Sequence, residues 1–152
     1  MHIHFVCSGN TYRSRIAETH LNSLKLPNTN ASSSGINADK NINGPITWPA
    51  LWLIKTYNLI NFVAPSWKQT NAELLNNADF VIFMEDSVFN ACKQKCGFRK
   101  NRFQVWNIPD LDMSIEDFEG DEYLFALYSM NFTEKIYKKI VSQTKQLLIE
   151  IN

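Results

Sequence analysis

The sequence lacks an excess of charge of either sign. Fifteen lysine and arginine residues balance fifteen aspartate and glutamate residues over a length of 152. A chain without net charge produces no general field that attracts nucleic acid or an anionic membrane, so an anionic ligand has to be held by a local group of residues. We therefore expect neither a nucleic-acid partner nor a membrane partner.

Long hydrophobic runs are also missing. No apolar segment approaches the roughly 20 residues that a membrane-spanning helix requires, and the opening MHIHFV has no basic stretch typical of a secretion signal. These absences predict a cytoplasmic protein. The length and the hydrophobic content of 45% suit one compact domain, which we place at residues 1–152, and we expect a monomer or a weak dimer.

Cysteine is sparse, with Cys7, Cys92 and Cys96 as its only occurrences. An odd, sparse set is unlike the disulfide framework of a small secreted domain and favours a reducing compartment. Cys92 and Cys96 share a helix face, but no second cysteine pair or histidine is spaced to complete a zinc site. We expect no metal and no cofactor.

Short strand-like segments alternate with helical patterns along the chain. Strand signals occur around Ile3–Val6, in ADFVIFMED and in FQVWNIP, while the polar stretch 27–47 reads as a loop region with room for one short strand. Helical patterns follow the first strand, then occupy 48–59 and 87–96, and end the chain with apolar residues four apart. This alternation predicts an α/β fold with a mainly parallel sheet and helices on both faces.

One short motif, VCSGNTYRSR at residues 6–15, joins an apolar strand to a helix. The amino end of a helix presents unpaired N–H groups and a positive dipole, which suit a tetrahedral oxyanion such as phosphate. Gly9 allows close approach of the backbone, and the planar fork of Arg13 suits two phosphate oxygens. This motif, which we call the Cys7 loop (residues 7–14), therefore indicates a phosphate site.

Cys7 adds the chemistry of a nucleophile to that site. A helix amino terminus and a nearby cation favour the thiolate, which is the nucleophilic form of cysteine. Ser14 is placed to donate a hydrogen bond to the sulfur, and Asn10 tolerates the left-handed backbone of a tight loop. Either Cys7 or Arg13 alone would more often be structural, but their spacing and context together favour a functional site.

The motif C-x5-R-S near the amino terminus resembles that of the low-molecular-weight protein tyrosine phosphatases and their arsenate reductase relatives. Ile16-Ala17-Glu18, Ser34-Gly35, ADFVIFMED and IPDLD continue the resemblance along nearly the whole chain. It implies a three-layer α/β/α fold around a four-stranded sheet, and hydrolysis through a phosphocysteine. The implied catalytic residues are Cys7, Arg13 and Asp110, and the implied phosphate-binding residues are Ser8, Gly9, Asn10, Thr11, Tyr12, Arg13 and Ser14.

Asp110 stands where the family has its general acid, which protonates the leaving oxygen of the substrate. Asp112 is the competing candidate, and without the Cys7 loop either aspartate would read as a turn or capping residue. Trp48 is a candidate for the wall of the substrate cleft. A buried core tryptophan at the start of a helix is the alternative for that position.

Several positions depart from the family pattern, among them Leu111, Asp112 and Met113, which stand where the family often has Pro-Tyr and a further aromatic residue that packs against the substrate ring. Tyr12 stands where most members of the family have a second cysteine, which can trap oxidised Cys7 as a disulfide. Tyr12 could alternatively be a core residue. Arg15 replaces a proline and would add positive charge at the pocket mouth, suited to an acidic substrate, if it faces solvent. Glu85 replaces an aspartate, which leaves open whether that position supports Arg13.

The preferred substrate class is a phosphorylated protein carrying phosphotyrosine. A protein arginine phosphatase is an alternative, because such enzymes resemble this family and carry a threonine at the position of Thr11. Arsenate reductase is a second alternative, although ADFVIFMED lacks the cysteine that those enzymes use. The third is a non-catalytic module that binds a phosphoryl group, which would follow if neither Asp110 nor Asp112 reaches the pocket.

Overall fold

The computed structural model describes residues 1–151 and centres on one four-stranded sheet. All three strand pairs are parallel, and the strand order is β2-β1-β3-β4. The mainly parallel sheet of four strands is therefore confirmed. The strands are β1 (His2–Cys7), β2 (Asn30–Gly35), β3 (Phe80–Phe83) and β4 (Phe103–Val105).

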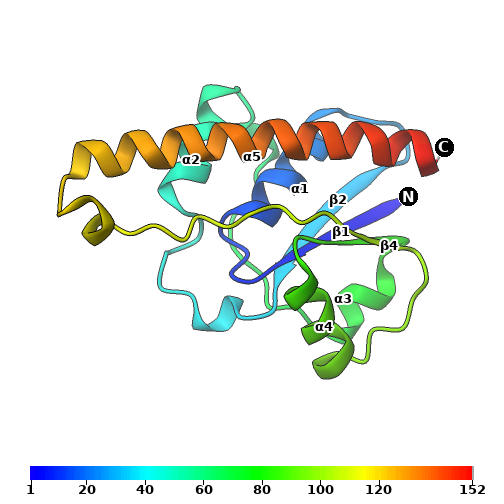
Figure 1. Ribbon diagram of the computed structural model, residues 1–152. Coiled ribbons are helices and arrows are strands. Elements are labelled where there is room, and N and C mark those ends of the chain that lie inside the picture. The colour runs from blue at the N-terminus through cyan, green and yellow to red at the C-terminus, as the bar shows by residue number, and fades with distance from the viewer. Residues whose placement is uncertain (152) are drawn as a thin grey trace.

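Helices cover both faces of this sheet (Figure 1). One face carries α1 (Arg13–Ser23), α2 (Trp48–Thr56) and the long α5 (Glu122–Ile151), and the other carries α3 (Ala72–Asn77) and α4 (Asp86–Lys95). The expected three-layer α/β/α architecture is thus confirmed. Short 3₁₀ helices lie at Ala38–Lys40, Ile60–Phe62 and Ile115–Phe118.

Two details differ from the sequence expectation. Helix α3 was not expected, because it has only six residues and buries only Leu75, too little for a helical period to show. Strand β4 ends at Val105 instead of continuing to Pro109. The chain nevertheless stays beside β3, since Trp106 N donates to Phe83 O at 2.9 Å and Ile108 N donates to Met84 O at 2.8 Å.

Two hydrophobic clusters hold the layers together. The first core packs the sheet against α1, α2 and α5, with Phe5, Ile16 and Ile140 fully buried. The second core lies on the face of α3 and α4 and is rich in aromatic rings, with Phe83 contacting Phe89, Phe98 and Phe103. Both cores are apolar, yet each contains one buried cysteine, Cys7 in the first and Cys92 in the second.

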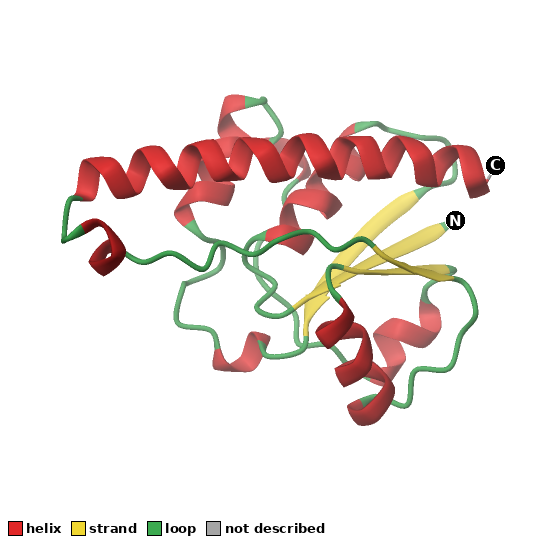
Figure 2. Cartoon of the chain, viewed as in Figure 1, coloured by secondary structure: helices red, strands yellow, loops and turns green. Residues whose placement is uncertain are grey.

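The connecting loops gather at the carboxyl ends of the strands (Figure 2). Ligands of open parallel sheets bind at this edge, so the topology places the Cys7 loop, which follows β1, where a site is expected. Within residues 1–151, no helix combines the length and the apolar character needed to cross a membrane.

Candidate active site

Cys7 is the last residue of β1, and its side chain is 3% exposed. The Cys7 loop turns back over the sulfur, so that Asn10 N donates to Cys7 Sγ at 3.2 Å. This turn requires Asn10 to adopt the left-handed conformation, with φ of 53°, as the sequence led us to expect. Helix α1 then begins at Arg13, which places its amino terminus beside the thiol.

Ser14 contacts the sulfur from the first turn of α1, with its Oγ 2.9 Å from Cys7 Sγ. The amide nitrogen Nδ2 of Asn10 donates to the same hydroxyl oxygen at 2.8 Å. With Cys7 as a thiolate, the Ser14 hydroxyl is the donor in this contact, because a thiolate has no proton to give. Two hydrogen-bonding groups, one from the backbone and one from a side chain, thus converge on the sulfur of Cys7.

Arg13 is buried beneath the cleft, with its side chain 1% exposed. Its guanidinium donates to Ile108 O at 3.0 Å, lies 3.1 Å from Glu85 Oε2 and lies 2.9 Å from Asp110 Oδ2. Burial lowers the pKa of Arg13, but the charges of Asp110, Glu85 and Cys7 outweigh that effect and raise the pKa above its ordinary value. Glu85 therefore does support Arg13, which the sequence left open.

Arg13 also retains an unused donor. Its Nε is buried and has no hydrogen-bond partner within the part of the chain that the structure describes. A buried N–H without a partner is costly unless a ligand satisfies it. A phosphate oxygen would satisfy it, which is consistent with the expectation from the sequence.

A cleft of about 590 Å³ opens above the Cys7 loop. Trp48, Asp110 and Leu111 line it together with Cys7 and Arg13. Trp48 is 46% exposed. The alternative prediction, that Trp48 is a buried core residue, is therefore wrong. The cleft thus combines a nucleophile, a cation and a carboxylate with apolar walls.

Asp110 is brought to this cleft by the chain that continues from β4. Its Oδ2 accepts from Arg13 Nη2, and its Oδ1 accepts from Leu111 N at 3.0 Å. Asp112, two residues further on, is exposed and is not among the residues that line the cleft. Of the two aspartates, only Asp110 lines the cleft that contains Cys7.

Arg15 and Tyr12 both point inward. The side chain of Arg15 is 1% exposed, so the expectation of positive charge at the pocket mouth is wrong, and with it the reason for an acidic substrate. Tyr12 packs in the first core while it also lines the cleft, and its hydroxyl lies 2.7 Å from Thr133 Oγ1 on α5. Burial raises the pKa of Tyr12.

Two contacts of the Cys7 loop could not be foreseen from the sequence. A Cβ on Gly35, at the end of β2, would lie 2.5 Å from Ser8 O and 2.6 Å from Asn10 N, so only glycine fits there. Thr47 donates to Thr11 O from both its N, at 2.9 Å, and its Oγ1, at 3.1 Å. Gly35 was visible as part of a turn, but Thr47 carried no signal.

Comparison with known proteins identifies the family. The family model described as low molecular weight phosphotyrosine protein phosphatase matches residues 2–152. The chain belongs to this family. As a member of this phosphatase family, the protein is an enzyme that acts through a cysteine on phosphorylated proteins. No protein with curated annotation matches the sequence.

Solved structures of phosphatases share the fold. A low molecular weight protein tyrosine phosphatase from Bacillus subtilis is 21% identical, with full coverage of both chains and a TM-score of 0.73. Wzb from Vibrio vulnificus, solved with benzylphosphonate, is 22% identical over 95% of this chain and 97% of its own, with a TM-score of 0.70. The YwlE arginine phosphatase, solved as a mutant with a phosphorylated active-site serine, is 21% identical over 97% and 95%, with a TM-score of 0.68.

Proposed function

We propose that this phosphatase hydrolyses phosphotyrosine in proteins through a phosphocysteine formed on Cys7. The observation that carries the proposal is the convergence of the Cys7 sulfur, the Arg13 guanidinium and the Asp110 carboxyl group on one cleft. Phosphoryl transfer needs positioning and charge stabilisation more than covalent help from the protein. The Cys7 loop and Arg13 supply both, and no group of ligands suited to a metal ion occurs in residues 1–151.

In the first step the thiolate of Cys7 attacks phosphorus. A sulfur–phosphorus bond forms, the bond from phosphorus to the phenolic oxygen breaks, and Asp110 gives its proton to that oxygen. The phosphoryl oxygens compete for the guanidinium that now pairs with Asp110, which frees the carboxyl group to turn toward the leaving group. Arg13 and the loop amides stabilise the charge on the phosphoryl oxygens.

In the second step water attacks the phosphocysteine. Asp110 accepts the proton of the water, the phosphorus–sulfur bond breaks, and inorganic phosphate is released. Ser14, whose hydroxyl lies 2.9 Å from Cys7 Sγ, stabilises the departing thiolate. The same hydrogen bonds that activate the nucleophile therefore assist it as a leaving group.

Two apolar side chains in the lining of the cleft favour an aromatic substrate. Trp48 and Leu111 line the same cleft as Cys7 and could pack against a phosphotyrosine ring. Phosphoarginine is the second candidate, because Thr11 lines the same cleft and the YwlE arginine phosphatase shares the fold. The Trp48 ring in the cleft and the family membership favour phosphotyrosine.

Two other activities fit less well. Arsenate reduction needs further thiols that can exchange with Cys7, but Cys92 packs in the second core instead. A module that only binds phosphoryl groups would lack an acid in the cleft, whereas Asp110 lies there. Both observations support hydrolysis.

We further propose a cytoplasmic enzyme that acts as a monomer or weak dimer, without nucleic-acid or membrane partners. The balanced charge and the sparse cysteines support this setting. We propose residues 1–152 as one domain, since one sheet joins all four strands and α5 packs on both α1 and α2. Asn152 lies outside the described residues.

The test is the rate of phosphate release from matched phosphotyrosine and phosphoarginine peptides. We expect the higher kcat/KM for phosphotyrosine, and a phosphoenzyme with its phosphoryl group on Cys7 after rapid acid quench. A higher value for phosphoarginine would move the protein to the second class. No phosphate release from either peptide or from p-nitrophenyl phosphate would contradict hydrolysis altogether.

A further inference from the structure

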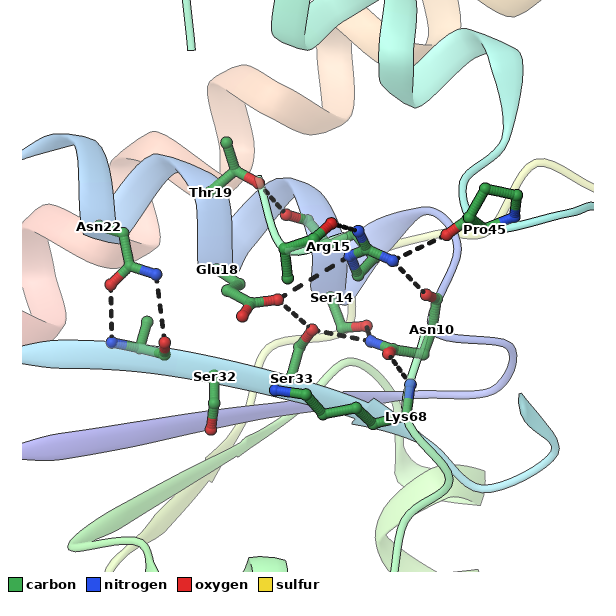
Figure 3. Close-up of polar contacts among 12 residues, drawn as sticks. Asn10, Ser14, Arg15, Glu18, Thr19, Asn22, Ser32, Ser33, Pro45 and Lys68 are labelled. Carbon is green, nitrogen blue, oxygen red and sulfur yellow. Dashed lines mark hydrogen bonds and ion pairs between the residues drawn. The ribbon is translucent and has the colours of Figure 1, made fainter. Parts of the chain in front are cut away.

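Arg15 lies on the first turn of α1 but is not among the residues that line the cleft, and its guanidinium reaches backbone carbonyls instead (Figure 3). Its Nη1 donates to Pro45 O at 2.8 Å and, more weakly, to Asn10 O at 3.5 Å. Its Nη2 donates to Ala64 O. One guanidinium thus joins three segments that are distant in the sequence.

Each of these segments contributes to the site. Pro45 belongs to a stretch that we call the wall loop (residues 41–48), which includes Trp48 and also contacts the Cys7 loop through Thr47. The stretch from Ala64 leads to Lys68, whose N donates to Asn10 Oδ1 at 2.8 Å. Arg15 therefore lies where the wall of the cleft and its phosphate-binding floor meet.

A buried carboxylate completes the arrangement. Glu18 Oε2 lies 3.9 Å from Arg15 Nε and accepts a hydrogen bond from Ser33 Oγ. Ser33 Oγ accepts in turn from Asn10 Nδ2 at 2.8 Å, and the same nitrogen donates to Ser14 (Figure 3). An ion pair followed by hydrogen bonds therefore connects Arg15 to the serine beside the nucleophile. In the ion pair, Arg15 Nε has no hydrogen-bond partner among residues 1–151.

Stability alone gives a poor account of this arrangement. Burial lowers the pKa of Arg15 and raises the pKa of Glu18, because each charge loses its hydration, and their mutual attraction offsets only part of that loss. Buried ion pairs often contribute no more to stability than apolar residues of the same size. What a planar, multidentate donor adds is a fixed geometry for the groups around it.

We propose that Arg15 is a positioning residue that holds the wall loop in register with the Cys7 loop. The inference rests on the proposed function, because a fixed wall matters only if the substrate extends beyond its phosphoryl group. Arg15 does not line the cleft and takes no part in the chemistry. Its effect is to keep the wall at the distance that a phosphorylated side chain needs.

Arg15→Met is the principal variant, because it keeps an unbranched side chain but removes every donor. The carbonyls of Pro45 and Ala64 must then find water, so the wall loop moves outward. We expect KM for the phosphotyrosine peptide to rise about tenfold. The inhibition constant of inorganic phosphate, which touches only the floor, should change by less than about twofold. Arg15→Lys retains the positive charge but loses the planar guanidinium. Its KM for the phosphotyrosine peptide should lie between the values of the wild type and of Arg15→Met.

Hydrogen exchange of the wall loop supplies a readout that does not depend on turnover. Amides of residues 41–47 should exchange faster in Arg15→Met than in the wild type. Asn22→Ala is the matched control, because Asn22 also ties α1 to a neighbouring segment, bonding Ala31 O at 3.1 Å and Ala31 N at 2.8 Å, but touches no loop of the site. This control should lose stability while KM and the exchange of residues 41–47 stay as in the wild type.

A double variant covers the case in which Arg15→Met fails to fold. Arg15→Met with Glu18→Gln removes the carboxylate that would otherwise be left without its cation, and it makes the same predictions. The proposal is wrong if a folded variant keeps both the wild-type KM and the wild-type exchange. It is also wrong if both variants fail to fold while Asn22→Ala folds, since Arg15 would then be needed for stability. Wild-type protein without turnover contradicts the proposed function instead, and the exchange measurement still tests the contact.

Discussion

Two cysteines of this protein are almost equally buried but occupy opposite faces of the sheet. Cys7 is 3% exposed in the first core, and Cys92 is fully buried in the second. Around Cys92 lie Val88, Phe98 and the other apolar side chains of the second core. Burial, followed by the charge of Cys96, raises the pKa of Cys92 to about 12.

Cys7 differs in what reaches its sulfur. Asn10 N and the Ser14 hydroxyl contact Cys7 Sγ, the amino terminus of α1 lies beside it, and the cleft opens above it. The two thiols therefore differ in their surroundings and hardly in their burial. We expect oriented donors and access to a substrate to make Cys7 the reactive one, and a strand that ends at a helix start provides both.

The largest expected effect comes from exchanging the sulfur itself. Cys7→Ser should lower kcat for the phosphotyrosine peptide by at least about 10⁴-fold, because a hydroxyl in this setting is a much weaker nucleophile than a thiolate. Phosphate release and acid-stable phosphoenzyme would be measured together. Cys92→Ser should keep the wild-type kcat, and equal losses in the two variants would remove the distinction between the cysteines.

The second effect concerns the carboxyl group above Cys7, for which Cys92 has no counterpart. Asp110→Asn should lower kcat by about 10²- to 10³-fold on substrates with poor leaving groups, and less on p-nitrophenyl phosphate, since a good leaving group needs no proton. Asp112→Asn is the control, because Asp112 is exposed outside the cleft. A larger loss in the Asp112 variant would reverse the assignment of the acid.

The third effect concerns the cation near Cys7. Glu85→Gln removes the charge 3.1 Å from the Arg13 guanidinium, which leaves Asp110 as its remaining carboxylate partner. We expect about a tenfold loss in kcat/KM, the range typical of groups that orient a functional side chain. The neighbouring, exposed Asp86→Asn should lose less than about twofold. If both variants behave alike, Glu85 contributes only to the net charge of the region.

The surroundings of Cys7 could be predicted from local sequence patterns. The strand, the tight loop and the helix start are contiguous in VCSGNTYRSR, and each residue type has a physical reason to be there. The left-handed Asn10 and the parallel sheet follow from such short-range signals. The resemblance to a family then supplied Asp110, which lies far from Cys7 in the sequence.

Contacts between segments that are distant in the sequence were harder to predict. The sequence did not show that Arg15 is buried. Two of its carbonyl partners belong to Pro45 and Ala64, and no local pattern connects these residues to Arg15. The role of Gly35 depends on the approach of another backbone, and helix α3 is too short to show a period. These features depend on tertiary packing, which a single chain does not encode in its local spacing.

The smallest effect on activity is expected at Cys92, where the change should appear in stability instead. Cys92→Ser places a hydroxyl among the rings of the second core, at a cost of about 1–3 kcal/mol in the free energy of unfolding, measured by urea denaturation. Cys96→Ser is the control, because Cys96 is only half-buried and should cost less. A Cys92 variant as stable as the wild type would mean that the second core admits water.

Alkylation tests the same contrast without any mutation. With its pKa raised to about 12, Cys92 stays a protonated thiol at mildly alkaline pH and should react with iodoacetamide only after unfolding. Cys7 lines the cleft, so it should be modified in the folded protein, with loss of activity and with protection by inorganic phosphate. Mass spectrometry of the digested protein identifies the labelled cysteine. Labelling of Cys92 before Cys7 would contradict the contrast, because neither burial nor a raised pKa would then protect Cys92.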